Sequence, residues 1–293
     1  MQEVSFDWSN SPNLVKIIVP FFKTLLKIFN IENDFDSIKR RYGLESSRIY
    51  TLRELGIYYD CAPSRIQQKE EVAMQRVHEA LTGELSLPEL EVPDAIKNEI
   101  KELRQILKAM GMIITEIEIF SMFTSRYNYS FIPRDAGAIR LLLRTLDFYQ
   151  AKKQSLPPNI ALQPSWITDP KFDEKAFYSK VISTRKVLEN HVTPLSSFDL
   201  IIECKRSRKK DLNADDLLII AKICKDILAT GESDYQLKFE SLSSVADKAY
   251  RVLYEANKPL HIREIHKEIN HKLAKENSPT NVHSRTLQNQ LLR

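Results

Sequence analysis

A short run of polar and basic side chains is the part of this sequence best suited to recognising a ligand. In the stretch 63–81, Ser64, Gln67, Gln68 and Glu71 fall on the face opposite the apolar residues, and Arg65 is a further candidate contact beside them. A glutamine amide can pair bidentately with adenine, and an arginine guanidinium with guanine or with phosphate. These residue types therefore predict contacts with the base edges of DNA.

Further contacts with the DNA backbone are expected at the starts of other helices. Thr51 and Arg53 begin the helix just before the run, where a helix-turn-helix contacts phosphates. From Ser241 onward the chain has nine Lys/Arg and five Asp/Glu, and Arg285 is the candidate contact there. A merely solvated helical surface would explain the same surplus.

A possible catalytic signature lies in the segment 198–205. An apolar strand ending in Glu203-x-Lys205 is the hallmark of restriction-type nucleases of the PD-(D/E)xK class, whose carboxylates hold magnesium. However, Asp199 is only four residues before Glu203, whereas the first acid of such a site comes ten or more residues earlier. Ser196 and Asp199 also fit the start of a helix, which we favour.

Other enzymatic chemistry has little support in the sequence. The three cysteines form no Cys-x-x-Cys pair, which fits a reducing cytosol. His261, His266 and His271 are five residues apart and fan around a helix, so one metal could not collect them. We therefore expect neither an enzyme nor a bound cofactor or metal.

One helix-start pattern occurs four times along the chain. It consists of an apolar residue, a capping residue, two free positions, an acid and another apolar residue. A Thr or Ser oxygen at the cap accepts the backbone N–H three residues on, while the acid reaches back to the N–H of the cap. In the last copy, histidine takes the place of the usual cap. The copies are 50–55, 114–119, 195–200 and 260–265.

Each copy lies between two amphipathic stretches. The stretches before the copies are 35–42, 96–110, 177–188 and 245–254. Those after them are 63–81, 135–149, 213–228 and 284–293. Helix, capped helix and helix in succession form the core of helix-turn-helix and winged-helix domains. We therefore predict an all-α dominated chain of tandem tri-helical modules with minor β wings, the first wing lying after Phe148.

Proline- and glycine-containing runs separate these modules. The expected linkers are 83–93, 155–170 and 231–241. The expected parts are 1–34, 35–82, 94–170, 171–232 and 241–293. The apolar stretch 14–29 contains three lysines and Pro20, so we expect an amphipathic packing helix rather than a membrane span.

The first module resembles region 4 of bacterial sigma-70 factors, the region that reads promoters. The carriers are Arg41-Tyr42-Gly43-Leu44, Thr51-Leu52-Arg53-Glu54-Leu55-Gly56 and Arg65-Ile66-Gln67-Gln68-Lys69-Glu70. The likeness covers 35–82, about one sixth of the chain. It implies a bacterial protein that binds double-stranded DNA, and docking on RNA polymerase.

Three departures from that family affect which DNA bases the helix in 63–81 would read. Pro63-Ser64 stands where Arg-Glu is usual, Gln67 where a second Arg is common, and Lys69 where an apolar residue is usual. Base preference should therefore differ from that of the usual promoter element, and a module kept only for packing is the alternative. We find no counterpart of the aromatic region that melts promoters, so a self-sufficient initiation factor is not expected.

The last module, 241–293, resembles the winged-helix family of restriction-system proteins and the polymerase delta subunit. The carriers are Ala249-Tyr250-Arg251-Val252-Leu253, Lys258-Pro259-Leu260-His261-Ile262-Arg263-Glu264-Ile265 and the segment 284–292. The family would next have a strand hairpin, and the sequence stops at Arg293.

Together these features predict a cytoplasmic DNA-binding protein. Its role would be that of an accessory transcription factor, or of the targeting part of a larger defence or restriction assembly. The alternatives are the nuclease subunit using Glu203 and Lys205, and a protein–protein scaffold. The sequence leaves the target site and the oligomeric state open.

Overall fold

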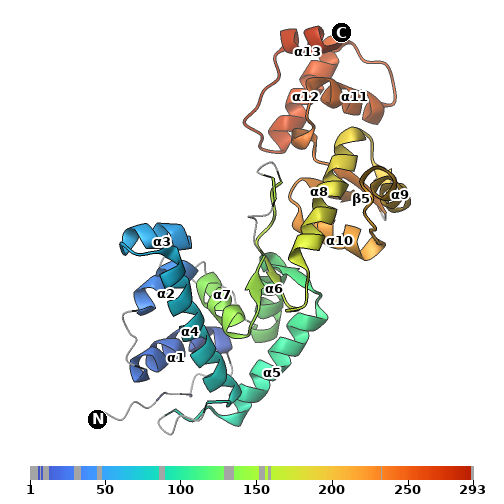
Figure 1. Ribbon diagram of the computed structural model, residues 1–293. Helices are drawn as coiled ribbons and strands as arrows, with labels where there is room; N and C mark the ends of the chain where they lie inside the picture. The colour runs from blue at the N-terminus through green and yellow to red at the C-terminus, as the bar shows by residue number, and fades with distance from the viewer. Residues whose placement is uncertain are drawn as a thin grey trace. The chain divides into compact units, whose positions relative to one another are not determined.

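The computed structural model describes residues 6, 8, 13–29, 34–44, 48–85, 90–128, 135–151, 156–157, 160–231 and 233–291. Two compact units make up the chain. Unit 1 is Met1–Ala151 with Ser165–Phe172, and unit 2 is Lys152–Pro164 with Asp173–Arg293. Helices dominate both units, and each holds one three-stranded antiparallel sheet among its described residues (Figure 1). The expectation of a helix-rich chain is confirmed.

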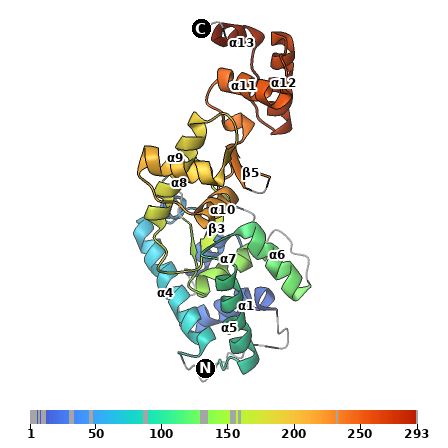
Figure 2. The same cartoon turned by 90° about the vertical axis from the view of Figure 1, so that its right-hand side faces the viewer.

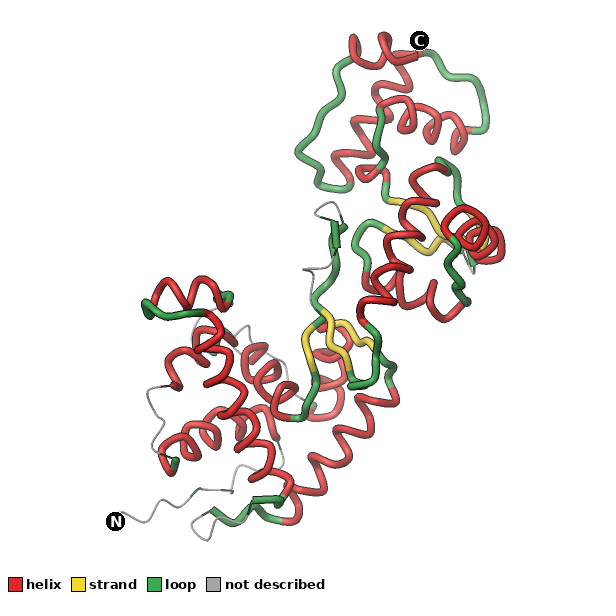
Figure 3. Tube along the Cα trace, in the orientation of Figure 1, coloured by secondary structure: helices red, strands yellow, loops and turns green. Residues whose placement is uncertain are grey.

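Unit 1 begins with seven helices that one short strand interrupts. Its elements are α1 (Leu14–Ile28), α2 (Phe35–Tyr42), α3 (Leu52–Tyr58), α4 (Pro63–Thr82), α5 (Asp94–Ala109), β1 (Ile113–Thr115), α6 (Glu116–Tyr127), α7 (Asp135–Thr145), β2 (Tyr149–Gln150) and β3 (Ser165–Ile167). The strand order is β1-β3-β2, with Ile113 and Tyr149 both opposite Ile167 (Figure 3).

The stretch 14–29 forms the expected packing helix. In α1 the side chain of Asn13 caps the first turn by accepting the N–H of Val15 at 3.1 Å. One face is buried, with Phe21 and Phe22 fully enclosed, while Lys23 points to solvent. Among the described residues, no helix has the length and apolar character needed to cross a bilayer.

Helix α7 lies at the centre of unit 1, where α1, α2 and α4 pack on it. Seven of its eleven residues are buried. A Cβ on Gly137 would lie 2.7 Å from the carbonyl oxygen of Tyr42, so only glycine allows this approach to the end of α2. On another side, Arg140 donates two hydrogen bonds to the buried Glu116, at 2.8 and 2.7 Å. The side chains of α7 are therefore used for packing.

Unit 2 begins with the order helix, strand, two helices, two strands, which the segment α5 to β3 of unit 1 also has. Three further helices follow. Its elements are α8 (Glu174–Asn190), β4 (Leu195–Ser196), α9 (Ser197–Arg208), α10 (Ala214–Ile223), β5 (Ile227–Thr230), β6 (Asp234–Leu237), the 3-10 turn η3 (Phe239–Ser241), α11 (Val245–Ala256), α12 (Ile262–Lys275) and α13 (Ser284–Leu291). The sheet order is β4-β6-β5, with Leu195 opposite Tyr235 and Ile227 opposite Leu237 (Figure 2).

Buried arginines hold unit 2 together. Arg185 of α8 donates to Asp226 at 2.5 Å, and both side chains are buried. Arg251 of α11 donates to the carbonyl oxygen of Val192 and, at 2.5 Å, to the amide oxygen of Gln236 on β6. The last three helices are therefore anchored to the sheet that precedes them.

All four predicted helix starts are confirmed. The backbone N–H of the cap residue reaches the acid in three copies: Thr51 to Glu54 at 2.7 Å, Thr115 to Glu118 at 2.9 Å and His261 to Glu264 at 2.7 Å. In the remaining copy the Ser196 hydroxyl accepts the N–H of Asp199 at 3.1 Å. Histidine does act as a cap, since the ring of His261 accepts the N–H of Arg263.

Two predicted helices were too long. The stretch 135–149 ends as a helix at Thr145 and continues into β2, while the stretch 213–228 ends at Ile223 and continues into β5. Buried apolar residues such as Phe148 and Ile227 continue beyond both helix ends, and short apolar runs do not separate helix from strand. The predicted linkers 155–170 and 231–241 contain β3 and β6, which pair with the distant strands β1 and β4, and the expectation of strands after Phe148 is confirmed. Residues 86–89, 155, 158–159, 232 and 292–293 of the predicted segments lie outside the described residues.

Replacing Gly137 by alanine is expected to lower the free energy of unfolding by about 1–3 kcal/mol, because the added Cβ overpacks the contact with α2. Chemical denaturation followed by circular dichroism measures the change. Ser121→Ala, at an exposed position of α6, should stay within about 0.5 kcal/mol. Equal stability of the two variants would contradict the central packing of α7.

Candidate nucleic-acid interface

Helices α3 and α4 are joined by a tight link that local chemistry fixes. Asp60 in the link has a positive φ of 49°, and a Cβ on Gly56 would lie 2.8 Å from the carbonyl oxygen of Cys61. Pro63 occupies the first turn of α4, where its missing N–H costs nothing. Helix α2 ends at Gly43 in the left-handed conformation, with a φ of 69°.

The six candidate residues of the first module are all exposed. They are Thr51 and Arg53 on α3, and Ser64, Arg65, Gln67 and Gln68 on α4. A shallow hollow of 570 Å³ between Arg53 and Pro63 adjoins the link, and a groove of 240 Å³ lies beside Arg65. The starts of α3 and α4 thus lie on either side of the link, and we call the surface that carries the six candidate residues the α4 face.

The opposite side of α4 is buried as its spacing predicted. Ile66, Ala73 and Val77 pack into the core, and Glu70 is buried with them. Glu70 accepts the hydroxyl hydrogen of Tyr42 at 2.5 Å and lies 3.7 Å from the guanidinium of Arg41. Burial, together with the charge of Glu70, raises the pKa of Tyr42 well above its ordinary value. This pair holds α4 on α2 with its polar side outward.

A second set of contacts holds the end of α3 against α2. The Arg40 guanidinium donates to Asp36 at 3.0 Å and to the Tyr58 hydroxyl at 3.1 Å, and it lies 4.4 Å from the Tyr58 ring. The Tyr59 hydroxyl donates to the same carboxylate of Asp36. Burial and the hydrogen bond to Asp36 raise the pKa of Tyr59 to about 12.

The α4 side chains that are predicted to contact bases differ in the contacts they already make within the chain. Gln67 donates to Glu71 at 2.8 Å, so its amide is held along the helix. Within the described part of the chain, no side-chain hydrogen bond or ion pair engages Ser64, Arg65 or Gln68. Arg65 and Gln68 are therefore the side chains most available for a ligand.

Arg285 lies in unit 2, whereas the other six candidate residues lie in unit 1. It is exposed on α13, where the buried Leu287 faces α11 and α12. Gln288 and Asn289 are also exposed, three and four positions after Arg285, so they share its side of the helix. These two amides were not among the predicted contacts, although their spacing from Arg285 is visible in the sequence.

The segment with Glu203 and Lys205 is helical, so the strand that a nuclease site of this class needs is not formed there. Both residues lie on α9, which Ser196 caps. Lys205 lies 3.1 Å from Asp211, and Glu203 lies 3.7 Å from Arg206. The described residues include no group of three or more His, Cys, Asp or Glu side chains that could hold a metal.

In comparisons with known proteins, no family model, no curated protein and no solved structure matches the chain.

Tyr59→Phe is expected to raise the pKa of Asp36 toward its ordinary value of 3.8, because the Tyr59 hydrogen bond is the largest cause of its lowering. In the unaltered chain the lowered pKa means that ionised Asp36 stabilises the fold above about pH 4, and that this is lost as the pH falls. An NMR titration of the Asp36 carboxyl measures the shift. Tyr149→Phe, on β2, should leave it unchanged, and an identical titration in both variants would refute the contact.

Proposed function

We propose that this chain binds double-stranded DNA and reads base sequence with the α4 face. The observation that carries the proposal is the exposed start of α4, where Arg65 and Gln68 have no partner among the described residues. A guanidinium and an amide one turn apart can each make a bidentate pair with a base in the major groove. Arg53 and Thr51, at the start of the preceding helix, would then contact phosphates.

The order of elements supports the proposed tandem modules. The segments α5 to β3 and α8 to β6 each run helix, strand, helix, helix, strand, strand, which is the order of a winged helix. The segments α2 to α4 and α11 to α13 each run through three helices. We therefore keep the division into four tri-helical modules as a proposal.

The third helices of these modules differ in what they can offer to a groove. Helix α7 is buried, and α10 exposes Asp215 and Leu218, which suit neither base edges nor phosphates. Helices α4 and α13, in contrast, both expose arginine and amide side chains. On this proposal the third helices of the first and last modules contact DNA, while those of the two inner modules do not.

The wider role proposed is that of an accessory transcription factor working with RNA polymerase, or the targeting part of a larger assembly. It rests on the likeness of 35–82 to sigma region 4 and of 241–293 to restriction-system winged helices.

A protein–protein scaffold is the second candidate, because the inner modules expose apolar side chains. Ile117 on α6 is 69% exposed, and Phe198 on α9 is 71% exposed. Exposed apolar residues of this size are typical of protein contacts when they are grouped. This candidate predicts complexes with protein that Phe198→Ser weakens, without any selection of a DNA motif.

Selection from a pool of random duplexes tests DNA reading. We expect the unaltered chain to enrich a motif, and Arg65→Ala/Gln68→Ala to lose that preference, at about 1–3 kcal/mol for each bidentate pair. Gln75→Ala/Arg76→Ala removes the same residue types about two to three turns further along α4 and should keep the motif. A motif that survives the first double substitution would refute base reading by α4, and melting curves of both variants confirm folding.

A further inference from the structure

Helix α5 carries opposite charges along its two edges. The ridge Ile96, Ile100, Leu103 and Leu107 is buried in unit 1. The residue after each of these is basic: Lys97, Lys101, Arg104 and Lys108. On the other edge lie the acidic residues Glu99 and Glu102. The spacing of the basic residues places them in one row along the helix.

The acidic edge is neutralised inside unit 1. Arg126 of α6 donates two hydrogen bonds to Glu99, at 2.8 and 2.7 Å, and one to Glu102 at 2.8 Å. The Tyr127 hydroxyl also donates to Glu99, at 2.7 Å. This edge therefore has its counter-charge in the fold.

The basic edge faces an open groove between α5 and the end of α4. The groove has a volume of 410 Å³ and is lined by all four basic residues, by Asn98 and Gln105, and by residues at the end of α4. Glu84 is the acidic residue that lines it. The amides of Asn98 and Gln105 add hydrogen-bond donors that suit an oxygen-rich anion. We call this the α5 groove.

Counter-charges reach only part of the basic row. Lys97 lies 3.3 Å from the exposed Asp94, and Arg104 lies 3.7 Å from Asp147. Lys101 and Lys108 are exposed and form no ion pair with any described residue. Two positive charges of the α5 groove are thus left for a ligand.

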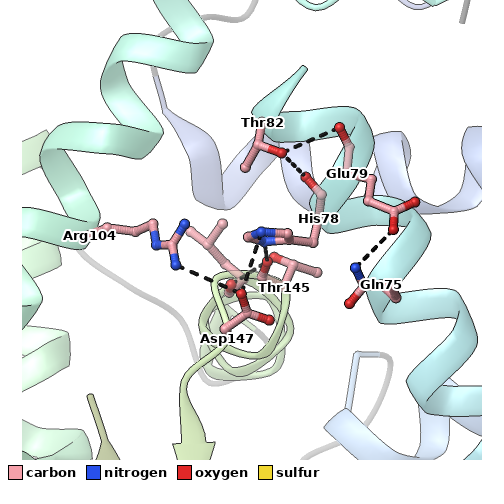
Figure 4. Close-up of polar contacts among 8 residues, drawn as sticks. Gln75, His78, Glu79, Thr82, Arg104, Thr145 and Asp147 are labelled. Atoms are coloured by element: carbon pink, nitrogen blue, oxygen red, sulfur yellow. Dashed lines mark hydrogen bonds and ion pairs between the residues drawn. The ribbon is translucent and has the colours of Figure 1, made fainter. Parts of the chain in front are cut away.

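The Arg104 side of the α5 groove is held by contacts from other helices. Asp147 lies between Arg104 and the buried His78 of α4, whose Nε2 is 3.4 Å from the carboxylate (Figure 4). The Nδ1 of His78 is 2.7 Å from the carbonyl oxygen of Thr145 and donates to it. Arg104 is therefore held in place through Asp147 by contacts with α4 and with the end of α7.

We propose that the α5 groove binds the phosphate backbone of double-stranded DNA, at a contact separate from the α4 face. From Lys97 to Lys108 the row rises about 16 Å along the helix. Measured along the duplex axis, that length covers roughly five phosphates of one strand, at about 3.4 Å of axis for each. The proposal rests on DNA binding by this chain, and adds a sequence-independent contact to the base-reading one.

The two contacts are distinct, because the α5 groove adjoins Thr82 at the end of α4, whereas Arg65 is at its start. A helix of 20 residues is about 30 Å long. Substitutions in the α5 groove should therefore leave base preference unchanged.

The test measures the affinity for a random-sequence duplex over a series of salt concentrations. Each phosphate contact contributes about 0.9 to the slope of log affinity against log salt. Lys101→Gln/Lys108→Gln should therefore lower the magnitude of the slope by about 2. Lys23→Gln/Lys27→Gln removes the same charge from exposed positions of α1 and should leave the slope unchanged. Equal slopes for both variants and the unaltered chain would overturn the proposal.

The outcomes separate this proposal from base reading by α4. A lowered slope with the motif retained supports both, and a lowered slope in a chain that selects no motif supports the α5 groove alone. A motif without a change of slope leaves only base reading. Competition by poly-glutamate as strong as by duplex DNA would assign the α5 groove to an acidic polypeptide and overturn the proposal.

Discussion

The packing of α7 against the end of α2 is the contact on which unit 1 depends. Gly137 lets the backbone of α7 approach the carbonyl oxygens of Tyr42 and Gly43, and no larger residue fits there without movement. Through this contact the helices before residue 90 and those after it share one core, with α1 covering α7 from another side. The cost is that α7 has no free face, so its side chains are not available to a ligand.

The local parts of this arrangement could be predicted from the sequence because their causes are local. A capping box needs a cap residue and an acid three positions on, and Thr51 with Glu54 forms one as expected. The inward and outward sides of α4 followed from helical spacing alone, including the buried Glu70. The same helical spacing that buries one side of α4 leaves Arg65 and Gln68 exposed on the other.

The remaining parts depend on contacts between residues far apart in the chain. The end of α7 at Thr145 was missed because β2 pairs with β3, whose residues come 16 and more positions later. The burial of α7 could not be foreseen either, since its amphipathic spacing resembles that of a surface helix. The α5 groove was missed for a related reason. The charges on both edges of α5 are visible in the sequence, but the fold alone decides that Arg126 neutralises one edge.

The second helices of the four proposed modules, α3, α6, α9 and α12, show both the local spacing and the exposure that the fold decides. Two positions after each cap stands an exposed residue: Arg53 in α3, Ile117 in α6, Phe198 in α9 and Arg263 in α12. The cap residue and the acid fix the start of each helix, whereas the side chain two positions after the cap takes no part in the capping. In the outer modules it carries a charge that can contact phosphate, and in the inner modules it is apolar. The same division between outer and inner modules holds for the third helices, where α13 exposes Arg285 and α10 exposes Leu218. On the proposed division into modules, the second and third helices of the outer modules thus offer charged and amide side chains, whereas those of the inner modules offer apolar ones, and the inner α5 offers its basic row instead.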